Sequence, residues 1–289
     1  MNDPDSTNVR APFEVIDGIK CYAPAVALDC NDYPSSGFDV TAAVEARSFW
    51  CRTRNRVLGQ VFKRFTDRTR PLDVLEVGCG IGGVIGSLRQ LPNLRLTGSE
   101  IYIHGLRYAK SRLPDVEFIQ LDATNIPFRE AFDVIGAFDV LEHIPDDERA
   151  MSEVAKTVRP GGLFIVTVPQ YPWMWSRLDD LVHHKRRYTR RELVGKLEKA
   201  GFEVRYVTSF VSVLFPAMVA QRLYERVRGA GTDAAAEFCA HVSPPAVVNT
   251  LFDWLMRIDE AALRLGFTLP FGGSLLAVAQ RPGGGSSAR

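Results

Sequence analysis

The chain has 289 residues, of which 46% are hydrophobic and 24% charged, and its formal net charge is +1. This length and composition predict a globular protein with one full core and additions to it. A net charge near zero excludes a general electrostatic attraction to nucleic acid or to an anionic membrane. The five cysteines are scattered without a C-x-x-C pair, which argues against a disulfide framework or a zinc site and favours a reducing cytoplasm.

The chain begins with Met-Asn-Asp-Pro-Asp-Ser, which is neither basic nor apolar, so we expect no signal peptide and a cytoplasmic protein. Residues 1–37 are interpreted as an N-terminal extension whose polar start is disordered. Residues 38–66 predict a helix that Thr41 can cap.

The most informative segment is 74–83, an apolar strand that leads into a glycine-rich turn and then a helix over 84–91. Gly78 and Gly80 can adopt a positive φ or let a ligand approach the backbone. A strand, a glycine turn and a helix N-terminus in this order are typical of a site for a nucleotide-like cofactor.

Two glycine patterns overlap in this turn. Gly78, Gly80 and Gly83 satisfy G-x-G-x-x-G, the fingerprint of dinucleotide binding. Glu76 with Gly78, Gly80 and Gly82 satisfies E-x-G-x-G-x-G. The turn alone does not separate a nicotinamide cofactor from S-adenosylmethionine, so the later elements must decide.

The later strands each end in polar residues. Strand 94–98 is followed by Glu100, which lies 20 residues past Gly80, where a carboxylate can bind a ribose diol. Strand 116–121 is followed by Asp122 and Ala123. Strand 132–138 leads into Asp139-Val-Leu-Glu-His143, and Arg159-Pro-Gly-Gly precedes a strand over 163–168.

These five motifs, in this order, resemble the class I S-adenosylmethionine-dependent methyltransferases of the bacterial small-molecule type. The resemblance implies an α/β fold with a Rossmann-like, seven-stranded, doubly wound sheet whose seventh strand is antiparallel. It also implies S-adenosylmethionine as the cofactor. The residues that it assigns to cofactor binding are Glu76, Gly78, Cys79 and Gly80 at the turn, Glu100 and Ile101 at the ribose, Asp122 and Ala123 at the adenine, and Phe138, Trp50 and Arg54.

The segment around Phe49, Trp50 and Arg54 resembles a helix that covers the cofactor in many of these enzymes. There an arginine can meet the methionine carboxylate, for which a guanidinium is well suited. The alternative is a helix with a packed aromatic face and solvated arginines.

His143, His184 and Tyr188 are the candidate catalytic residues. His143 follows the fourth strand, at the edge where open α/β sheets bind ligands, and could accept a proton from a hydroxyl group. Residues 184–189 match a His-x-x-Arg-Tyr-Thr pattern that recurs in the same bacterial methyltransferases; the alternative is a solvated basic loop. Residues 139–143 are also similar to the Glu-x-x-Glu-His of ubiquinone-type O-methyltransferases, where these side chains can hold a divalent metal. Here the first position is Asp139, and no metal ligand is assigned.

After a loop over 170–188, a helix capped by Thr189 ends near Gly201, strand six covers 202–207, and strand seven covers 274–279. Residues 38–208 with 273–282 therefore form the expected cofactor-binding domain. Residues 209–272 form a helical insertion between strands six and seven, interpreted as a packed subdomain, a substrate cap or an oligomerisation element. Residues 283–289 are a flexible tail.

The predicted function is transfer of a methyl group from S-adenosylmethionine to a small molecule, with O-methylation of a natural product or lipid-linked compound preferred. The alternatives are a non-catalytic S-adenosylmethionine-binding scaffold and, with less support, a nucleic-acid methyltransferase or a nicotinamide oxidoreductase. No nucleic-acid partner is expected, because no Asn-Pro-Pro-Tyr stands after the fourth strand. Peripheral membrane contact and a homodimer stay open.

Overall fold

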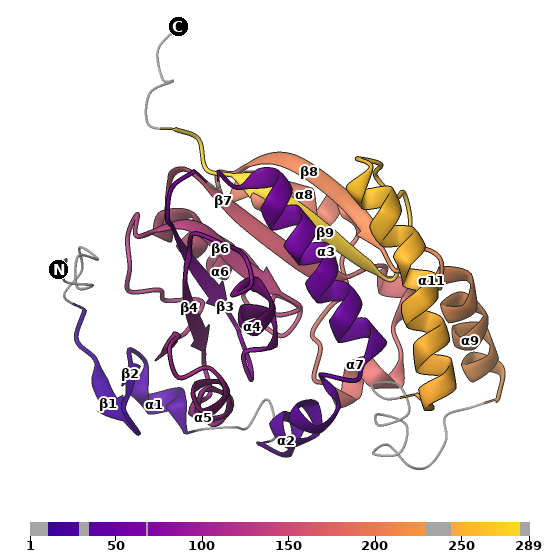
Figure 1. Ribbon diagram of the computed structural model, residues 1–289, viewed down its shortest axis with the longest axis horizontal. Helices are drawn as coiled ribbons and strands as arrows, with labels where there is room; N and C mark the ends of the chain where they lie inside the picture. The colour runs from indigo at the N-terminus through magenta and orange to yellow at the C-terminus, as the bar shows by residue number, and fades with distance from the viewer. Residues whose placement is uncertain (1–10, 29–34, 68, 229–243, 284–289) are drawn as a thin grey trace, which may run out of the picture.

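The computed structural model describes residues 11–28, 35–67, 69–228 and 244–283, and its centre is a nine-stranded sheet (Figure 1). The strand order is β1-β2-β5-β4-β3-β6-β7-β9-β8. The strands are β1 (Glu14–Ile16), β2 (Ile19–Cys21), β3 (Leu72–Val77), β4 (Leu94–Glu100), β5 (Glu117–Gln120), β6 (Phe132–Phe138), β7 (Val158–Pro169), β8 (Glu203–Phe210) and β9 (Ser274–Gln280).

The five central strands, β5, β4, β3, β6 and β7, are parallel, while β9 is antiparallel to both β7 and β8. Every residue of β6 is buried, as expected for a parallel strand covered on both faces. The predicted doubly wound α/β sheet is therefore present in the seven neighbouring strands β5-β4-β3-β6-β7-β9-β8, and its antiparallel strand is β9.

Helices cover both faces of this sheet. They are α1 (Pro24–Ala27), α2 (Ser35–Val44), α3 (Phe49–Phe65), α4 (Gly83–Leu88), α5 (Ile103–Arg112), α6 (Asp147–Thr157), α7 (Arg177–Leu181), α8 (Arg190–Lys199), α9 (Phe215–Arg228) and α11 (Ala246–Arg264), with a 3-10 turn at Pro172–Met174. One hydrophobic core contains residues of α3, α4 and α11, and the core on the opposite face contains residues of α6 and α8. In Figure 1, α3 and α11 cross the front of the sheet.

The prediction of seven strands is wrong by two. A hairpin of β1 and β2, from within the predicted extension 1–37, adds to the edge of the sheet, where β2 runs parallel to β5. Ile19 and Cys21 are buried in this hairpin, so the apolar residues of the segment join a core. Residues 1–10 and most of the predicted tail, 284–289, lie outside the described residues.

The helix predicted over 38–66 is two helices, α2 and α3, separated at residues 45–48. Thr41 is not its cap: it lies inside α2, where its hydroxyl donates to the carbonyl oxygen of Gly37 at 2.8 Å. In the break between the helices, the carboxylate of Glu45 accepts from Arg112 of α5 at 2.9 Å. This long-range contact, which no local pattern encodes, accompanies the change of direction.

The helical insertion packs directly on α3. The side-chain oxygen of Asn249 in α11 accepts from the backbone N–H of Phe49 at 2.8 Å. Arg56 of α3 forms ion pairs with Asp253 at 2.9 Å and Glu260 at 2.6 Å, both on α11. Together α3 and α11 form one layer, so the described part of the insertion contributes to the core of the domain. Residues 229–243 lie outside the described residues.

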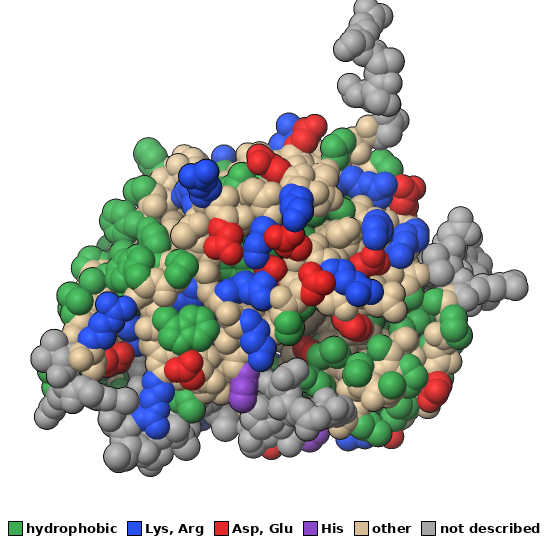
Figure 2. Space-filling model, turned by 180° about the vertical axis from the view of Figure 1, so that it is seen from behind, with side chains coloured by type: hydrophobic (Ala, Val, Ile, Leu, Met, Phe, Trp, Pro, Cys, Tyr) green, Lys and Arg blue, Asp and Glu red, His purple; other side chains and the backbone are tan. Residues whose placement is uncertain are grey.

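The opposite face of the molecule carries interspersed acidic and basic side chains (Figure 2). Ion pairs join α8 to α6, between Lys199 and Glu148 at 2.6 Å and between Lys196 and Asp147 at 2.6 Å. Within the ranges that the structure describes, no helix is both long and apolar enough to cross a membrane.

Candidate active site

The predicted site residues converge because β3, β4, β5 and β6 are parallel neighbours. Their carboxyl ends meet at one edge of the sheet, which is where open α/β folds bind ligands. The glycine turn follows β3, Glu100 ends β4, Asp122 follows β5, and Asp139 follows β6. The topology therefore brings these four strand ends to one edge of the sheet.

Gly78 and Gly80 of the glycine turn have different surroundings. Gly78 has φ +71°, and a Cβ there would overlap the side chain of Val140. Gly80 has φ +51°, and a Cβ there would meet no atom of the described residues within 4 Å. Gly78 is therefore required by packing, whereas Gly80 borders open space beside the turn, where a ligand can approach the backbone.

Glu76 is a buried carboxyl group below this turn. Its side chain is 3% exposed, and its Oε2 atom has no hydrogen-bond partner among the described residues. Burial raises the pKa of Glu76 to about 8, against the opposing charge of Arg54. A cationic ligand group would favour the ionised form and provide the missing partner.

Glu100 holds the end of β4 to the glycine turn. Its Oε2 accepts from the N–H of Gly80 at 3.0 Å, and its Oε1 accepts from the N–H of Ile101 at 2.7 Å. Burial raises the pKa of Glu100, although these backbone donors oppose the rise. A carboxylate oxygen accepts more than one bond, so this anchoring leaves capacity for a ribose diol.

The other predicted cofactor residues occupy different environments. Asp122 is half-buried, and its Oδ1 accepts from both the N–H and the hydroxyl of Thr124, at 2.7 and 2.8 Å. Ala123 is half-buried against the core, and Phe138 is buried within it. Cys79 is buried, and burial raises the pKa of its thiol, so its side chain is a small group that packs within the turn.

The segment of α3 predicted to cover the cofactor makes contacts of its own. The indole of Trp50 stacks on Phe210 with ring centroids 5.4 Å apart. Arg54 donates to Oδ2 of Asp139 at 3.0 Å, and the hydroxyl of Thr167 donates to Oδ1 of Asp139 at 3.1 Å. Burial opposes the charge of Arg54, but Asp139 raises its pKa. Arg54 is therefore a buried, paired cation rather than a solvated one.

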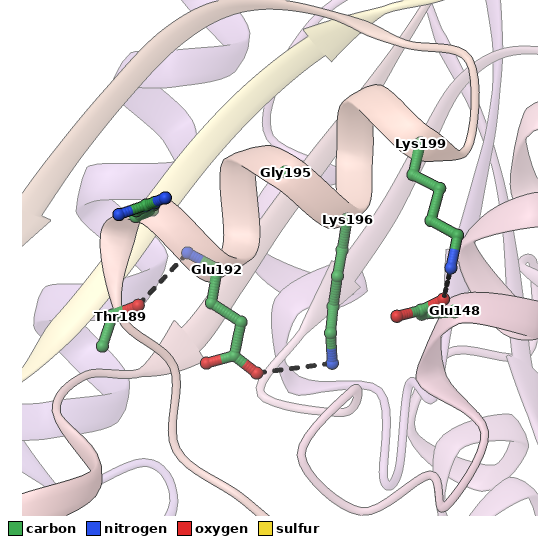
Figure 3. Close-up of a pocket in the computed structure, with 7 residues that line it drawn as sticks. Glu148, Thr189, Glu192, Gly195, Lys196 and Lys199 are labelled. Atoms are coloured by element: carbon green, nitrogen blue, oxygen red, sulfur yellow. Dashed lines mark hydrogen bonds and ion pairs between the residues drawn. The ribbon is translucent and has the colours of Figure 1, made fainter.

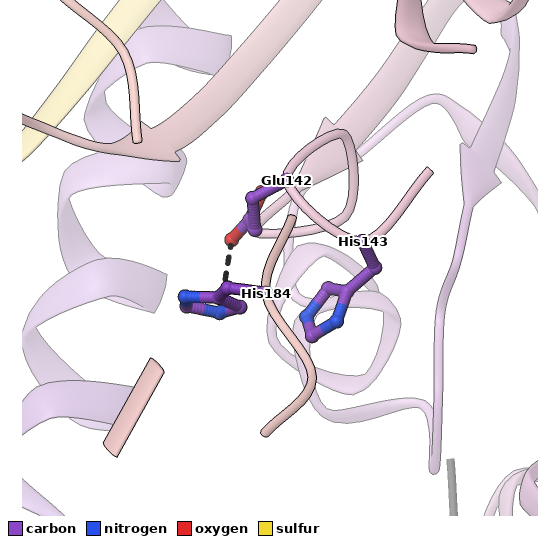
Figure 4. Close-up of side chains that lie close together, drawn as sticks. All are labelled: Glu142, His143 and His184. Carbon is purple, nitrogen blue, oxygen red and sulfur yellow. Dashed lines mark ion pairs between the residues drawn. The ribbon is translucent and has the colours of Figure 1, made fainter. Parts of the chain in front are cut away.

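Two histidines from separate loops lie together beyond β6 and β7. The rings of His143 and His184 have centroids 4.7 Å apart, and Nε2 of His184 lies 3.9 Å from Oε1 of Glu142. Figure 4 shows the three side chains, with a dashed line for the contact between Glu142 and His184. Burial, with the nearby charge of His184, lowers the pKa of His143 to about 3, so this ring is neutral near pH 7.

Tyr188 is placed differently from the prediction. It is fully buried in the core, and its hydroxyl donates to Oδ2 of Asp147 at 2.7 Å. Burial and this acidic partner raise its pKa. The expectation that Tyr188 faces an acceptor is corrected, because a phenol held inside the core cannot reach one.

Sequence reasoning missed Asp179, which organises the histidine loop. Its Oδ1 is 2.8 Å from Nδ1 of His184, and Arg187 donates to both of its oxygens, at 2.7 and 3.0 Å. Ser176 and Asp179 form the capping box of α7. The Ser-x-x-Asp pattern could have pointed to Asp179 in the sequence, because it predicts the start of a helix within the segment expected to be a loop.

A surface groove of about 420 Å³ runs along α8 (Figure 3). It contains none of the predicted site residues; its lining is Glu148, Thr189, Arg191, Glu192, Gly195, Lys196 and Lys199. The lysines pair with acidic neighbours, at 2.6 Å for Lys199 with Glu148 and 3.4 Å for Lys196 with Glu192. Because the groove contains none of the predicted cofactor residues, we place the candidate site at the carboxyl edge of the sheet instead.

Comparison with known proteins agrees with this topology. Residues 75–166 match the methyltransferase domain family. A "probable S-adenosylmethionine-dependent methyltransferase" of Mycolicibacterium smegmatis is 30% identical over 174 residues, which cover 59% of this chain and 66% of that protein. A phthiotriol/phenolphthiotriol dimycocerosates methyltransferase of Mycobacterium tuberculosis is 39% identical over 95 residues, 32% of this chain and 35% of that protein. The chain thus spans two thirds or less of the length of these relatives.

A solved structure shares the fold. Phosphoethanolamine N-methyltransferase 2 of Haemonchus contortus, in complex with S-adenosyl-L-methionine, superposes with a TM-score of 0.56 at 18% identity, covering 88% of this chain and 59% of that one. The strand order, the glycine turn and the matched domain together define a class I methyltransferase. The chain belongs to the class I S-adenosylmethionine-dependent methyltransferases, and its cofactor is S-adenosylmethionine.

Proposed function

We propose that this protein transfers the methyl group of S-adenosylmethionine to the oxygen of a small, lipophilic acceptor. The observation that carries the proposal is the open space at Gly80, bordered by the unpartnered carboxyl of Glu76 and the anchored carboxylate of Glu100. This arrangement supports cofactor binding with the methionine ammonium near Glu76 and the ribose near Glu100. The carboxylate of Asp122 then accepts a hydrogen bond from the exocyclic amine of the adenine.

The chemistry requires little from the protein beyond placement. The acceptor oxygen attacks the methyl carbon, the new C–O bond forms as the S–C bond breaks, and the sulfonium becomes a neutral thioether. The protein contributes alignment and exclusion of water. His143, at the same sheet edge, is the proposed acceptor of the hydroxyl proton. Burial lowers its pKa, so the ring is neutral near pH 7 but a weak base, and a bound acceptor must raise that pKa for the proton to be taken.

The lipophilic character of the acceptor is supported by the names of relatives. Matches include a phthiotriol/phenolphthiotriol dimycocerosates methyltransferase and a sterol 24-C-methyltransferase. The insertion of this chain exposes apolar side chains as well, among them Leu251 and Trp254 of α11. An acceptor with an apolar body and one nucleophilic oxygen is the class to test first.

The test measures binding and transfer separately. S-adenosylhomocysteine at 100 times its dissociation constant should raise the free energy of unfolding by about 2.7 kcal/mol, whereas NAD should not. Radiolabelled methyl transfer is then followed with aliphatic alcohols, sterols and phenols, and with amines for comparison. Cofactor binding without transfer to any hydroxylated acceptor would favour the non-catalytic alternative, and transfer only to amines or carbon would refute the oxygen assignment.

A further inference from the structure

Glu142, His143 and His184 form a compact set of metal-ligand side chains. Each offers one ligand atom, and the three atoms lie within 4.8 Å of one another (Figure 4). The first two residues follow β6 and the third follows α7, so the fold joins two loops at this point. Their backbones are tied together, since the N–H of Lys185 donates to the carbonyl oxygen of Glu142 at 2.7 Å.

Glu142 has an unused acceptor in the interior. The residue is 1% exposed, and its Oε2 has no hydrogen-bond partner among the residues that the structure describes. A buried polar atom without a partner costs about 1–3 kcal/mol, so such atoms usually mark a ligand or an ordered water. Here the atom belongs to the same carboxylate that lies 3.9 Å from Nε2 of His184.

The second carboxylate, Asp179, sets the orientation of His184. Asp179 accepts bonds from Arg187 and Ser176 and cannot itself donate, so Nδ1 of His184 must be the donor in their 2.8 Å contact. The Nε2 atom of a neutral ring then carries a lone pair, and this atom is the one that faces Glu142. A carboxylate–histidine pair of this kind is the usual outer support of a metal-bound imidazole.

We propose that Glu142, His143 and His184 bind one divalent transition-metal ion, with Zn²⁺ or Fe²⁺ as the best-suited ions. Two imidazoles and one carboxylate are a ligand set for either ion that leaves a position open. Ligands around tetrahedral zinc lie about 3.4 Å apart, from metal–ligand distances near 2.1 Å. The side chains must therefore close by small rotations when the ion binds.

This ligand set differs from the one suggested by the similarity to ubiquinone-type enzymes. Asp139 is held by Arg54 and Thr167, so it does not join the cluster. His184, from a loop about 40 residues later in the chain, takes part instead. Metal binding at this cluster can be measured apart from methyl transfer. With the ion bound, His143 is a ligand and no longer the proton acceptor, and use of the open position by an acceptor oxygen rests on the proposed function.

The test uses the full-length protein, freed of its purification tag and treated with a chelator. Titration with Zn²⁺ by calorimetry, and with Co²⁺ by visible absorption, should each give one site per chain. Glu142→Gln and His184→Ala should weaken the affinity for both ions by more than 100-fold, and Asp179→Asn by about 10–100-fold, as for an outer-sphere support. His183→Asn is the matched control, because the neighbouring His183 is exposed and lies outside the cluster, and it should bind as the wild type does.

Retained affinity for S-adenosylhomocysteine in each variant reports that the fold is intact. The proposal is overturned if the wild-type protein takes up neither ion, or if Glu142→Gln and His184→Ala bind as tightly as His183→Asn. Loss of cofactor binding or of methyl transfer with intact metal uptake would count against the proposed function alone.

Discussion

Arg54 of α3 and Asp139 after β6 form a partly buried ion pair at 3.0 Å across the carboxyl edge of the sheet. Their side chains are 14% and 20% exposed. Sequence analysis had assigned Arg54 to a cofactor carboxylate and compared Asp139 with a metal ligand. The structure pairs the two with each other, which fixes the N-terminal helix over the site.

Breaking this pair should destabilise the protein. Arg54→Gln leaves Asp139 without its cation and should lower the free energy of unfolding by up to about 3 kcal/mol, the lower end of the range for a buried pair. The double variant Arg54→Gln with Asp139→Asn should recover most of that loss, since no unpaired charge remains. Urea denaturation measures the free energy of unfolding of both variants. An unchanged free energy in Arg54→Gln alone would show that the ion pair does not stabilise the fold.

Glu76 should make the stability of the cofactor-free protein depend on pH. Its pKa is raised from 4.5 to about 8 by burial, with Arg54, Glu45 and Glu100 as the charged neighbours. A raised pKa favours the protonated folded state, so this contribution is complete below pH 4.5 and is lost as the pH rises toward 8. The unfolding free energy should fall in that window by at most about 1.4 kcal/mol per pH unit. Glu76→Gln should flatten the fall, and an unchanged pH profile in this variant would assign the dependence to other groups.

Binding of S-adenosylhomocysteine should release a proton from the same group near pH 7. The ligand's ammonium favours ionised Glu76, which is mostly protonated in the free protein. Calorimetry in two buffers with different ionisation enthalpies should give a proton release approaching one per site. Equal binding enthalpies in both buffers would place the ammonium elsewhere.

Gly78 and Gly80 should respond differently to substitution. Gly78→Ala places a methyl group against Val140 and should cost about 1–3 kcal/mol of stability through overpacking, in addition to about 1–2 kcal/mol for its positive φ. Gly80→Val projects into open space, so its larger effect should be on cofactor affinity, in addition to about 1–2 kcal/mol for a positive φ. Thermal unfolding and calorimetry separate the two effects, and tight cofactor binding by Gly80→Val would contradict the proposed position.

His143 and Tyr188 should separate catalysis from folding. His143→Ala should slow turnover by about 10²–10⁴-fold while cofactor affinity is retained, as expected for loss of a proton acceptor in the metal-free protein or of a metal ligand. Tyr188→Phe removes the buried bond to Asp147 and should cost about 1–3 kcal/mol of stability, with normal turnover per folded molecule. Kinetics normalised to folded protein test both, and the reverse pattern would restore Tyr188 as the catalytic candidate.

The sheet was predictable because its signals are local. Most central strands are short, largely apolar runs, with a polar residue at or just after the end of β4, β5 and β6, and parallel strands bring those ends together. Glu76, Gly80, Glu100 and Asp122 could therefore be placed at one edge from the order of motifs alone. The hairpin of β1 and β2 was missed because three-residue strands carry almost no periodic signal.

What only the tertiary structure decided is which charged groups meet. Arg54 and Asp139 are 85 residues apart in the chain, Arg56 and Glu260 are 204 apart, and Tyr188 and Asp147 are 41 apart. The sequence by itself determined the central strands and the glycine turn, since hydrophobic periodicity and glycine conformation act over a few residues. The partners of buried charges are selected by the packing of distant segments, where the cost of leaving a charge unpaired is imposed only after the core has excluded water.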